Sequence, residues 1–177
     1  MLKTAVIVIA LFVIVPLVIA MMRPDTFRVE RSTTIAAPAA RVHGLINDIH
    51  AFNTWNPYNA KDPAMRGEYR GPAAGPGAQF HFEGNKDVGK GSVSIVDTAP
   101  AKVTMTLDML KPFEGHNTIE FILAPQGAER TEVTWAMYGP MAFIAKVASV
   151  FMNMDKMIGR DFEAGLANLK QRAEQPA

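Results

Sequence analysis

The chain of 177 residues contains no cysteine. This absence excludes thiol catalysis, disulfide bonds and cysteine-based zinc sites. Histidine is also scarce: the four histidines, at positions 43, 50, 81 and 116, do not form the histidine or histidine–carboxylate spacing of a metal site. No serine nucleophile elbow and no glycine-rich phosphate-binding loop occurs. We therefore expect no metal and no cofactor, and we assign no catalytic residue.

The chain also has almost no excess of charge of one sign. Lys and Arg together number 18, against 17 for Asp and Glu. Nucleic-acid binding depends on a dense positive surface, so nucleic acid is not an expected partner. Hydrophobic residues make up 49% of the chain, which is enough for one domain with a buried core.

Charged residues are absent from residues 5–22, AVIVIALFVIVPLVIAMM. With its flanks, this apolar run is long enough for a transmembrane helix. A cleaved signal peptide is the alternative, but its apolar core usually spans only about 7–15 residues. We therefore predict a membrane anchor over 1–23, a single domain over 24–177, and a single-pass protein of the cell membrane. Positive charges lie on both sides of the run, so they do not decide the orientation of the protein in the membrane.

Residues 24–177 have the pattern of an α+β fold. Residues 27–35 alternate apolar and polar side chains, which predicts a strand. A short helical segment follows, and Gly44 and Asn47-Asp48 predict that it is short or broken in two. From Met65 the period is two, which predicts about six antiparallel strands.

The C-terminal segment, from about Met141 to Arg172, has apolar residues at steps of three and four. This pattern predicts one long amphipathic helix that crosses the sheet. Gly159 and Gly165 lie inside it, and each costs about 1 kcal/mol relative to alanine. We therefore expect the helix backbone to approach the sheet or a ligand closely at these positions.

Four stretches carry a family resemblance: VERSTTIAAPAARVHGLINDIHAFNTWNPY (29–58), GKGSVSIVD (89–97), TEVTWAMYG (131–139) and MDKMIGRDFEAGLANLK (154–170). They resemble the START-like SRPBCC superfamily, and within it the polyketide cyclase/dehydrase-like branch with a helix-grip fold. The resemblance implies a curved antiparallel sheet of about six to seven strands around a long C-terminal helix, with an apolar cavity between them. Members bind lipids, polyketides or other hydrophobic molecules, and only some are enzymes. The superfamily has no common catalytic set.

The apolar sheet face and the methionine-rich helix face supply the predicted cavity lining. Flexible methionines and aromatic rings suit an adaptable apolar pocket, although the same side chains can fill a plain core. The predicted lining residues are Phe80, Phe82, Ile95, Met105, Leu107, Phe121, Trp135, Met137, Met154, Met157, Ile158 and Phe162.

Two further features are candidates for ligand contact. The stretch FNTWNPY, residues 52–58, follows the helical segment, and we predict that Trp55 and Tyr58 lie at the cavity mouth, either as a structural plug or as a lip that contacts the ligand. Arg31 is predicted on the inward face of the first strand. There it needs a carboxylate partner or an anionic ligand head group, so it is a possible polar anchor.

These features favour a membrane-anchored domain that binds a hydrophobic small molecule or a lipid. The first alternative is an enzyme of the polyketide or aromatic cyclase–dehydrase type, for which Arg31, Tyr58, His116 and Tyr138 are the first positions to mutate. The second alternative is a protein-interaction or chaperone-like module that receives an amphipathic partner segment.

Overall fold

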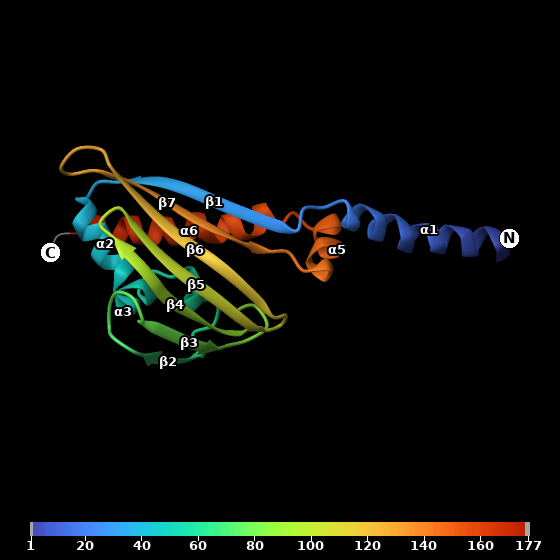
Figure 1. Cartoon of the computed structure of the whole chain (residues 1–177), viewed down its shortest axis with the longest axis horizontal. Helices are drawn as coiled ribbons and strands as arrows, with labels where there is room; N and C mark the ends of the chain where they lie inside the picture. Colours follow the sequence, from blue (N-terminus) through green and yellow to red (C-terminus); the bar gives the residue numbers. More distant parts are fainter. Residues whose placement is uncertain (1, 176–177) are drawn as a thin grey trace.

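The computed structural model describes residues 2–175, with side chains from residue 12 onward. Helix α1, Leu2–Met21, projects from one end of a domain in which a sheet encloses several helices (Figure 1). The predicted anchor at residues 5–22 lies partly outside the residues whose side chains are described. Over the part of the chain that is fully described, no helix combines the length and the apolar character needed to cross a membrane.

The seven strands form one antiparallel sheet in the order β1-β7-β6-β5-β4-β3-β2. Their bounds are β1 Thr26–Ile35, β2 Arg66–Arg70, β3 Gln79–Glu83, β4 Lys90–Ala99, β5 Lys102–Lys111, β6 Gly115–Pro125 and β7 Thr131–Pro140. Consecutive strands from β2 to β7 are joined as neighbours, and β1 pairs with the last strand, β7. The predicted strand at 27–35 and the predicted antiparallel strands after it are confirmed.

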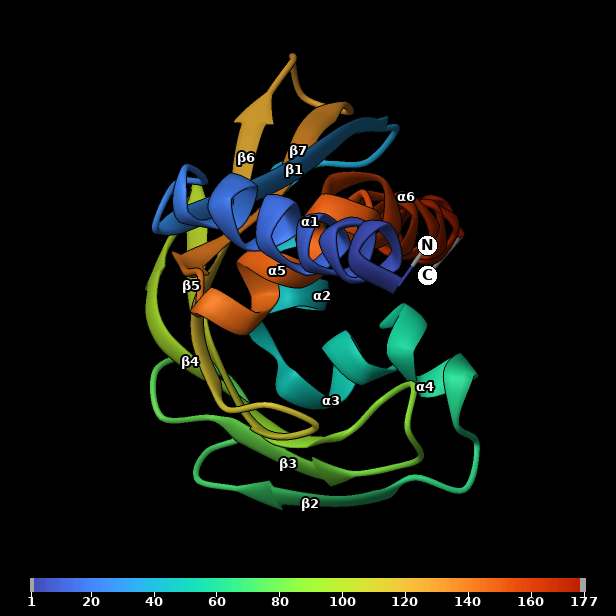
Figure 2. The same cartoon turned by 90° about the vertical axis from the view of Figure 1, so that its right-hand side faces the viewer.

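Helices α2, α3, α4 and α6 lie on the concave side of the curved sheet (Figure 2), and α5 lies beside α1 at the end from which α1 projects (Figure 1). Their bounds are α2 Ala39–Asn47, α3 Ile49–Asn53, α4 Pro57–Lys61, α5 Phe143–Phe151 and α6 Met154–Glu174. The predicted break in the first helical segment occurs at Asp48. Its carboxylate accepts hydrogen bonds from the backbone N–H groups of His50 and Ala51, which caps α3 and ends α2.

The prediction of one continuous C-terminal helix is wrong. The helix is interrupted at Met152 and Asn153, which separates α5 from α6. Both residues have extended backbone torsions, and the Asn153 side chain accepts a hydrogen bond from the backbone N–H of Lys156. Asparagine is a strong helix N-cap, but the apolar spacing continues through the break and conceals it.

Helix α6 lies against the sheet at its two glycines, as predicted. A Cβ atom at position 159 would overlap the guanidinium group of Arg31 on β1. A Cβ atom at position 165 would lie 2.5 Å from Trp135 on β7 and 2.9 Å from Pro57 at the start of α4. The absence of side chains at 159 and 165 therefore determines how closely α6 approaches the sheet.

We expect Gly165→Ala to lower the free energy of unfolding by about 1–3 kcal/mol, because the added methyl group meets Trp135 and Pro57 in a packed interior. Gly44→Ala is the matched control. Gly44 lies in α2, and no atom lies within 4 Å of the place that its added methyl group would take, so alanine there should stabilise the protein by about 0.5–1 kcal/mol. Urea unfolding of both variants measures the difference. Equal stability of wild type and Gly165→Ala would contradict the close contact.

Candidate functional site

The centre of the space between the sheet and α6 is filled by aromatic rings. Trp135 of β7 stacks on Phe162 of α6, with ring centroids 4.3 Å apart and an interplanar angle of 9°. The ring centroid of Trp135 lies 5.0 Å from that of Phe121 on β6 and 5.8 Å from that of Trp55. These four side chains are at most 2% exposed. This part of the predicted cavity is therefore a packed core.

Trp55 belongs to this core, so its predicted place at the cavity mouth is wrong. Its ring makes edge contacts with Phe52 and Phe121, and its indole Nε1 donates a hydrogen bond of 2.9 Å to the carbonyl oxygen of Leu45. Asn168 of α6 donates a further hydrogen bond to the Trp55 carbonyl oxygen. The turn after α3 directs the indole inward, and the stretch 52–58 accordingly holds a structural plug.

Tyr58 is half-buried on α4, beside α6. The Lys61 ammonium group lies 4.8 Å from the centre of its ring, and the same ammonium group pairs with Asp161 of α6 at 2.7 Å. Burial, together with the neighbouring Asp161 carboxylate, raises the pKa of the Tyr58 phenol. Tyr58 therefore stays protonated near neutral pH and can donate a hydrogen bond, but it is no general base.

The inner face of the sheet is less closed toward the end from which α1 projects. Four inner-face or α6 side chains there are half-buried, whereas those at the centre are buried. They are Phe82, Leu107, Met109 and Ile158. They lie close to the β3–β4 hairpin, the β5–β6 hairpin and the beginning of α6. At this end of the interior the apolar side chains are therefore the least buried.

Most of the predicted lining residues share this interior. Phe80, Ile95, Met105, Phe121, Trp135, Met137 and Phe162 belong to the buried core, and Phe82, Leu107 and Ile158 pack against it. Met154 is half-buried at the beginning of α6. Met157 is 52% exposed, so its predicted place in the lining is wrong. The buried stripe of α6 runs through Gly159, Phe162 and Leu166, and Met157 lies outside it.

Arg31 lies on the helix side of the edge strand β1, and α6 supplies its partners. Its Nε atom lies 2.9 Å from a carboxylate oxygen of Glu163, and its Nη2 atom lies 2.9 Å from one of Asp155. Hydrogen bonds from Arg31 lower the pKa of the Asp155 carboxyl. The predicted need for a carboxylate partner is thus met within the protein, and Arg31 is not free to bind an anionic head group.

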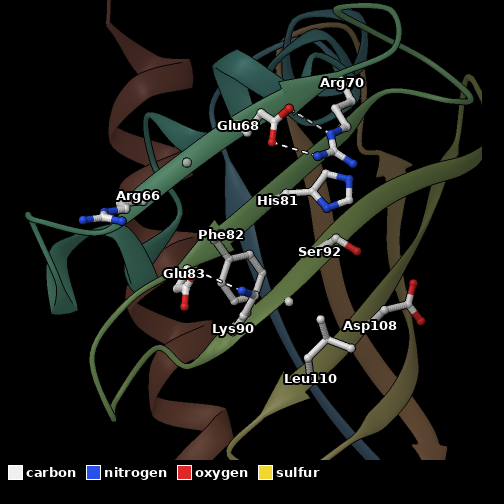
Figure 3. Close-up of a pocket in the computed structure, with 12 residues that line it drawn as sticks. Arg66, Glu68, Arg70, His81, Phe82, Glu83, Lys90, Ser92, Asp108 and Leu110 are labelled. Atoms are coloured by element: carbon white, nitrogen blue, oxygen red, sulfur yellow. Dashed lines mark hydrogen bonds and ion pairs between the residues drawn. The ribbon is translucent and has the colours of Figure 1, made fainter.

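A polar depression with a volume of about 380 Å³ lies on the opposite, outer face of β2–β5 (Figure 3). Four of its charged side chains form two ion pairs: Glu68 with Arg70 and Glu83 with Lys90, each with an N–O distance of 2.9 Å. Asp108 also lines the depression, and its carboxylate lies 2.6 Å from Nδ1 of His116. Sequence reasoning did not identify this depression, because it depends on how the strands come together in the folded sheet.

No group of three or more His, Cys, Asp or Glu side chains among the described residues could hold a metal ion.

Residues 26–174 match the family described as polyketide cyclase / dehydrase and lipid transport. The chain belongs to this family. The match covers the sheet and the helices α2–α6 and begins after α1. It confirms the resemblance to the SRPBCC superfamily that the sequence motifs indicated. No curated protein has a significantly similar sequence.

Solved structures share the helix-grip fold of this family member. The Zhui aromatase/cyclase from Streptomyces sp. R1128 is 18% identical, with a TM-score of 0.58 over 84% of this chain and 94% of its own. Major latex-like protein 151 from Panax ginseng is 13% identical, with a TM-score of 0.60 over 86% and 100%. A protein from Thermobifida fusca is 23% identical, with a TM-score of 0.61 over 82% and 92%. At these identities the likeness shows the fold alone.

We expect Trp55→Ala to lower the free energy of unfolding by about 3–5 kcal/mol, because it leaves a cavity among buried aromatic rings. Trp55→Phe is the matched control. It keeps most of the apolar volume and loses the hydrogen bond to Leu45, so its effect should be smaller. Urea unfolding measures both. An unchanged midpoint for Trp55→Ala would show that the indole does not close the core.

We also expect a pH-dependent contribution from the Arg31 and Asp155 pair. The folded-state pKa of Asp155 lies below 3.8, so the stabilisation is fully present above that value and is lost as the pH falls through the lowered pKa. The difference in free energy of unfolding between wild type and Asp155→Asn should therefore shrink from about pH 5 to about pH 2. Urea unfolding at several pH values tests this. A constant difference would contradict it.

Proposed function

We propose that this chain is a membrane-anchored domain that binds a hydrophobic small molecule or a lipid between the sheet and α6. The observation that carries the proposal is the apolar interior that stays half-buried at one end, around Phe82, Leu107 and Ile158. Membership of a family described by polyketide chemistry and lipid transport supports it, since both descriptions concern largely apolar molecules.

The indole of Trp135 is the candidate polar contact for such a ligand. Its indole Nε1 is buried and has no hydrogen-bond partner among the described residues. A buried donor without a partner lowers protein stability by about 1–3 kcal/mol, so a ligand acceptor that bonds to it would recover this free energy on binding. A ligand with a carbonyl or hydroxyl oxygen on an apolar body, placed beside the aromatic core, would meet this requirement.

The apolar run at residues 5–22 supports the anchor and a location in the cell membrane. A poorly soluble ligand is concentrated in the bilayer. A binding domain tethered there encounters it at a high effective concentration, without extracting it across bulk water. The tether therefore suits the proposed ligand class.

A cyclase–dehydrase enzyme is the second candidate, and it draws on the fold shared with the Zhui aromatase/cyclase. The candidate acid–base residues give it little support. Arg31 is paired with two carboxylates, and Tyr58 stays protonated. His116 pairs with Asp108 on the outer face, where the Tyr138 ring also lies beneath Arg28. Binding is therefore favoured over catalysis.

The binding proposal predicts that the full chain, purified in detergent from host membranes, retains an apolar ligand that native mass spectrometry detects. Leu107→Trp should reduce the retained ligand at least tenfold, because the larger ring fills the half-buried end of the interior.

Thr106→Trp is the matched control. Thr106 is the adjacent residue on β5 and faces the other side of the sheet, so its variant should retain the ligand. A wild-type chain that holds no ligand and does not bind a hydrophobic fluorescent probe would overturn the proposal. Equal ligand retention by the two tryptophan variants would show that the ligand does not bind in this interior.

A further inference from the structure

Exposed apolar side chains gather at the end of the domain from which α1 projects. They are 50–66% exposed and come from α5, from its junction with α6 and from the β5–β6 hairpin. The set, which we call the apolar rim, consists of Leu110, Phe113, Phe143, Ile144, Phe151 and Met152. Figure 2 looks onto this end, with α1 and α5 close together above the hairpin that joins β5 to β6.

The rim is held in a defined position relative to α1. Helix α5 packs against α1, and the Lys146 ammonium group of α5 pairs with Asp25, which lies between α1 and β1. The Lys146 side chain is only 9% exposed. The backbone N–H of Met141 donates a hydrogen bond of 2.7 Å to the carbonyl oxygen of Asp25. The exit of α1 and the first turns of α5 therefore form one unit.

We infer that the apolar rim docks onto the lipid bilayer and inserts its side chains into the interface. The inference rests on the proposed anchor: if α1 crosses the bilayer, the end of the domain around its exit faces the membrane surface. The rim residues come from separate segments, α5 with its junction to α6 and the β5–β6 hairpin, which lie on one side of this exit (Figure 2). Lys111 adjoins Leu110 in the hairpin, and a basic side chain beside exposed apolar residues suits an interface with anionic lipids.

Docking would place the half-buried end of the interior against the bilayer. Phe82, Leu107 and Met109 belong to the parts of β3 and β5 next to the β3–β4 and β5–β6 hairpins, and Ile158 to the beginning of α6, so they lie at the same end of the domain as the rim. An apolar ligand would then pass between the lipid and the interior along a path lined by α5 and the hairpin, without entering bulk water. The rim would serve as the entrance to the proposed binding site.

The absence of cysteine allows a direct test. Phe113→Cys and Ile144→Cys are made singly in the full chain, labelled with an environment-sensitive fluorophore, and reconstituted into vesicles of phosphatidylcholine with phosphatidylglycerol. Docking predicts that the emission of each label shifts to the blue and is quenched by nitroxide-labelled lipid.

The matched controls are Val96→Cys and Ile122→Cys, which replace exposed apolar residues toward the β4–β5 hairpin, away from the rim. Their labels should keep an aqueous emission maximum and escape quenching.

Flotation of the vesicles and native mass spectrometry of the same samples separate the possible failures. If the chain floats with the vesicles but all four labels remain in water, docking is wrong and the anchor stands. If the rim labels enter the lipid while no ligand is retained, docking stands and the binding proposal fails. If the chain does not float, both the anchor and the docking are wrong.

Discussion

The contact between α6 and the sheet is the constraint on which the rest of the domain depends. Gly159 and Gly165 let the helix backbone reach Arg31 and Trp135, and a side chain at either position would overlap one of them. The approach allows Trp135 and Phe162 to stack, and it lets Asp155 and Glu163 pair with Arg31. Hydrophobic packing and ion pairing thus hold the same helix in one position.

This constraint divides the interior into two parts. At the centre, the aromatic rings and the Trp55 plug leave a packed core. Toward α1, the beginning of α6 and the ends of β3 and β5 leave apolar side chains half-buried. The proposed ligand site and the apolar rim lie at this second end. Helix α6 spans both parts.

The fold was largely predictable because burial imposes a local period on the residues. The alternation of apolar and polar residues predicted the strands, and the glycines of α6 indicated a close approach of helix and sheet. The candidate site was less predictable. Trp55 and Met157 both satisfy an apolar pattern, yet one is buried and the other is half exposed. The break at Asn153 was also missed, because a capping side chain competes with a helical pattern that continues through it.

By itself, the sequence determined the α+β class, the apolar inner face, the family and the lack of thiol chemistry, since each follows from residue type and local spacing. Only the tertiary structure decided that Arg31 finds its carboxylates on α6, that the Trp135 indole has no hydrogen-bond partner among the described residues, and that exposed apolar residues lie near the exit of α1. These features join residues far apart in the chain. The spacing of residues within one element carries no information on such contacts, because they depend on how the helices pack against the curved sheet.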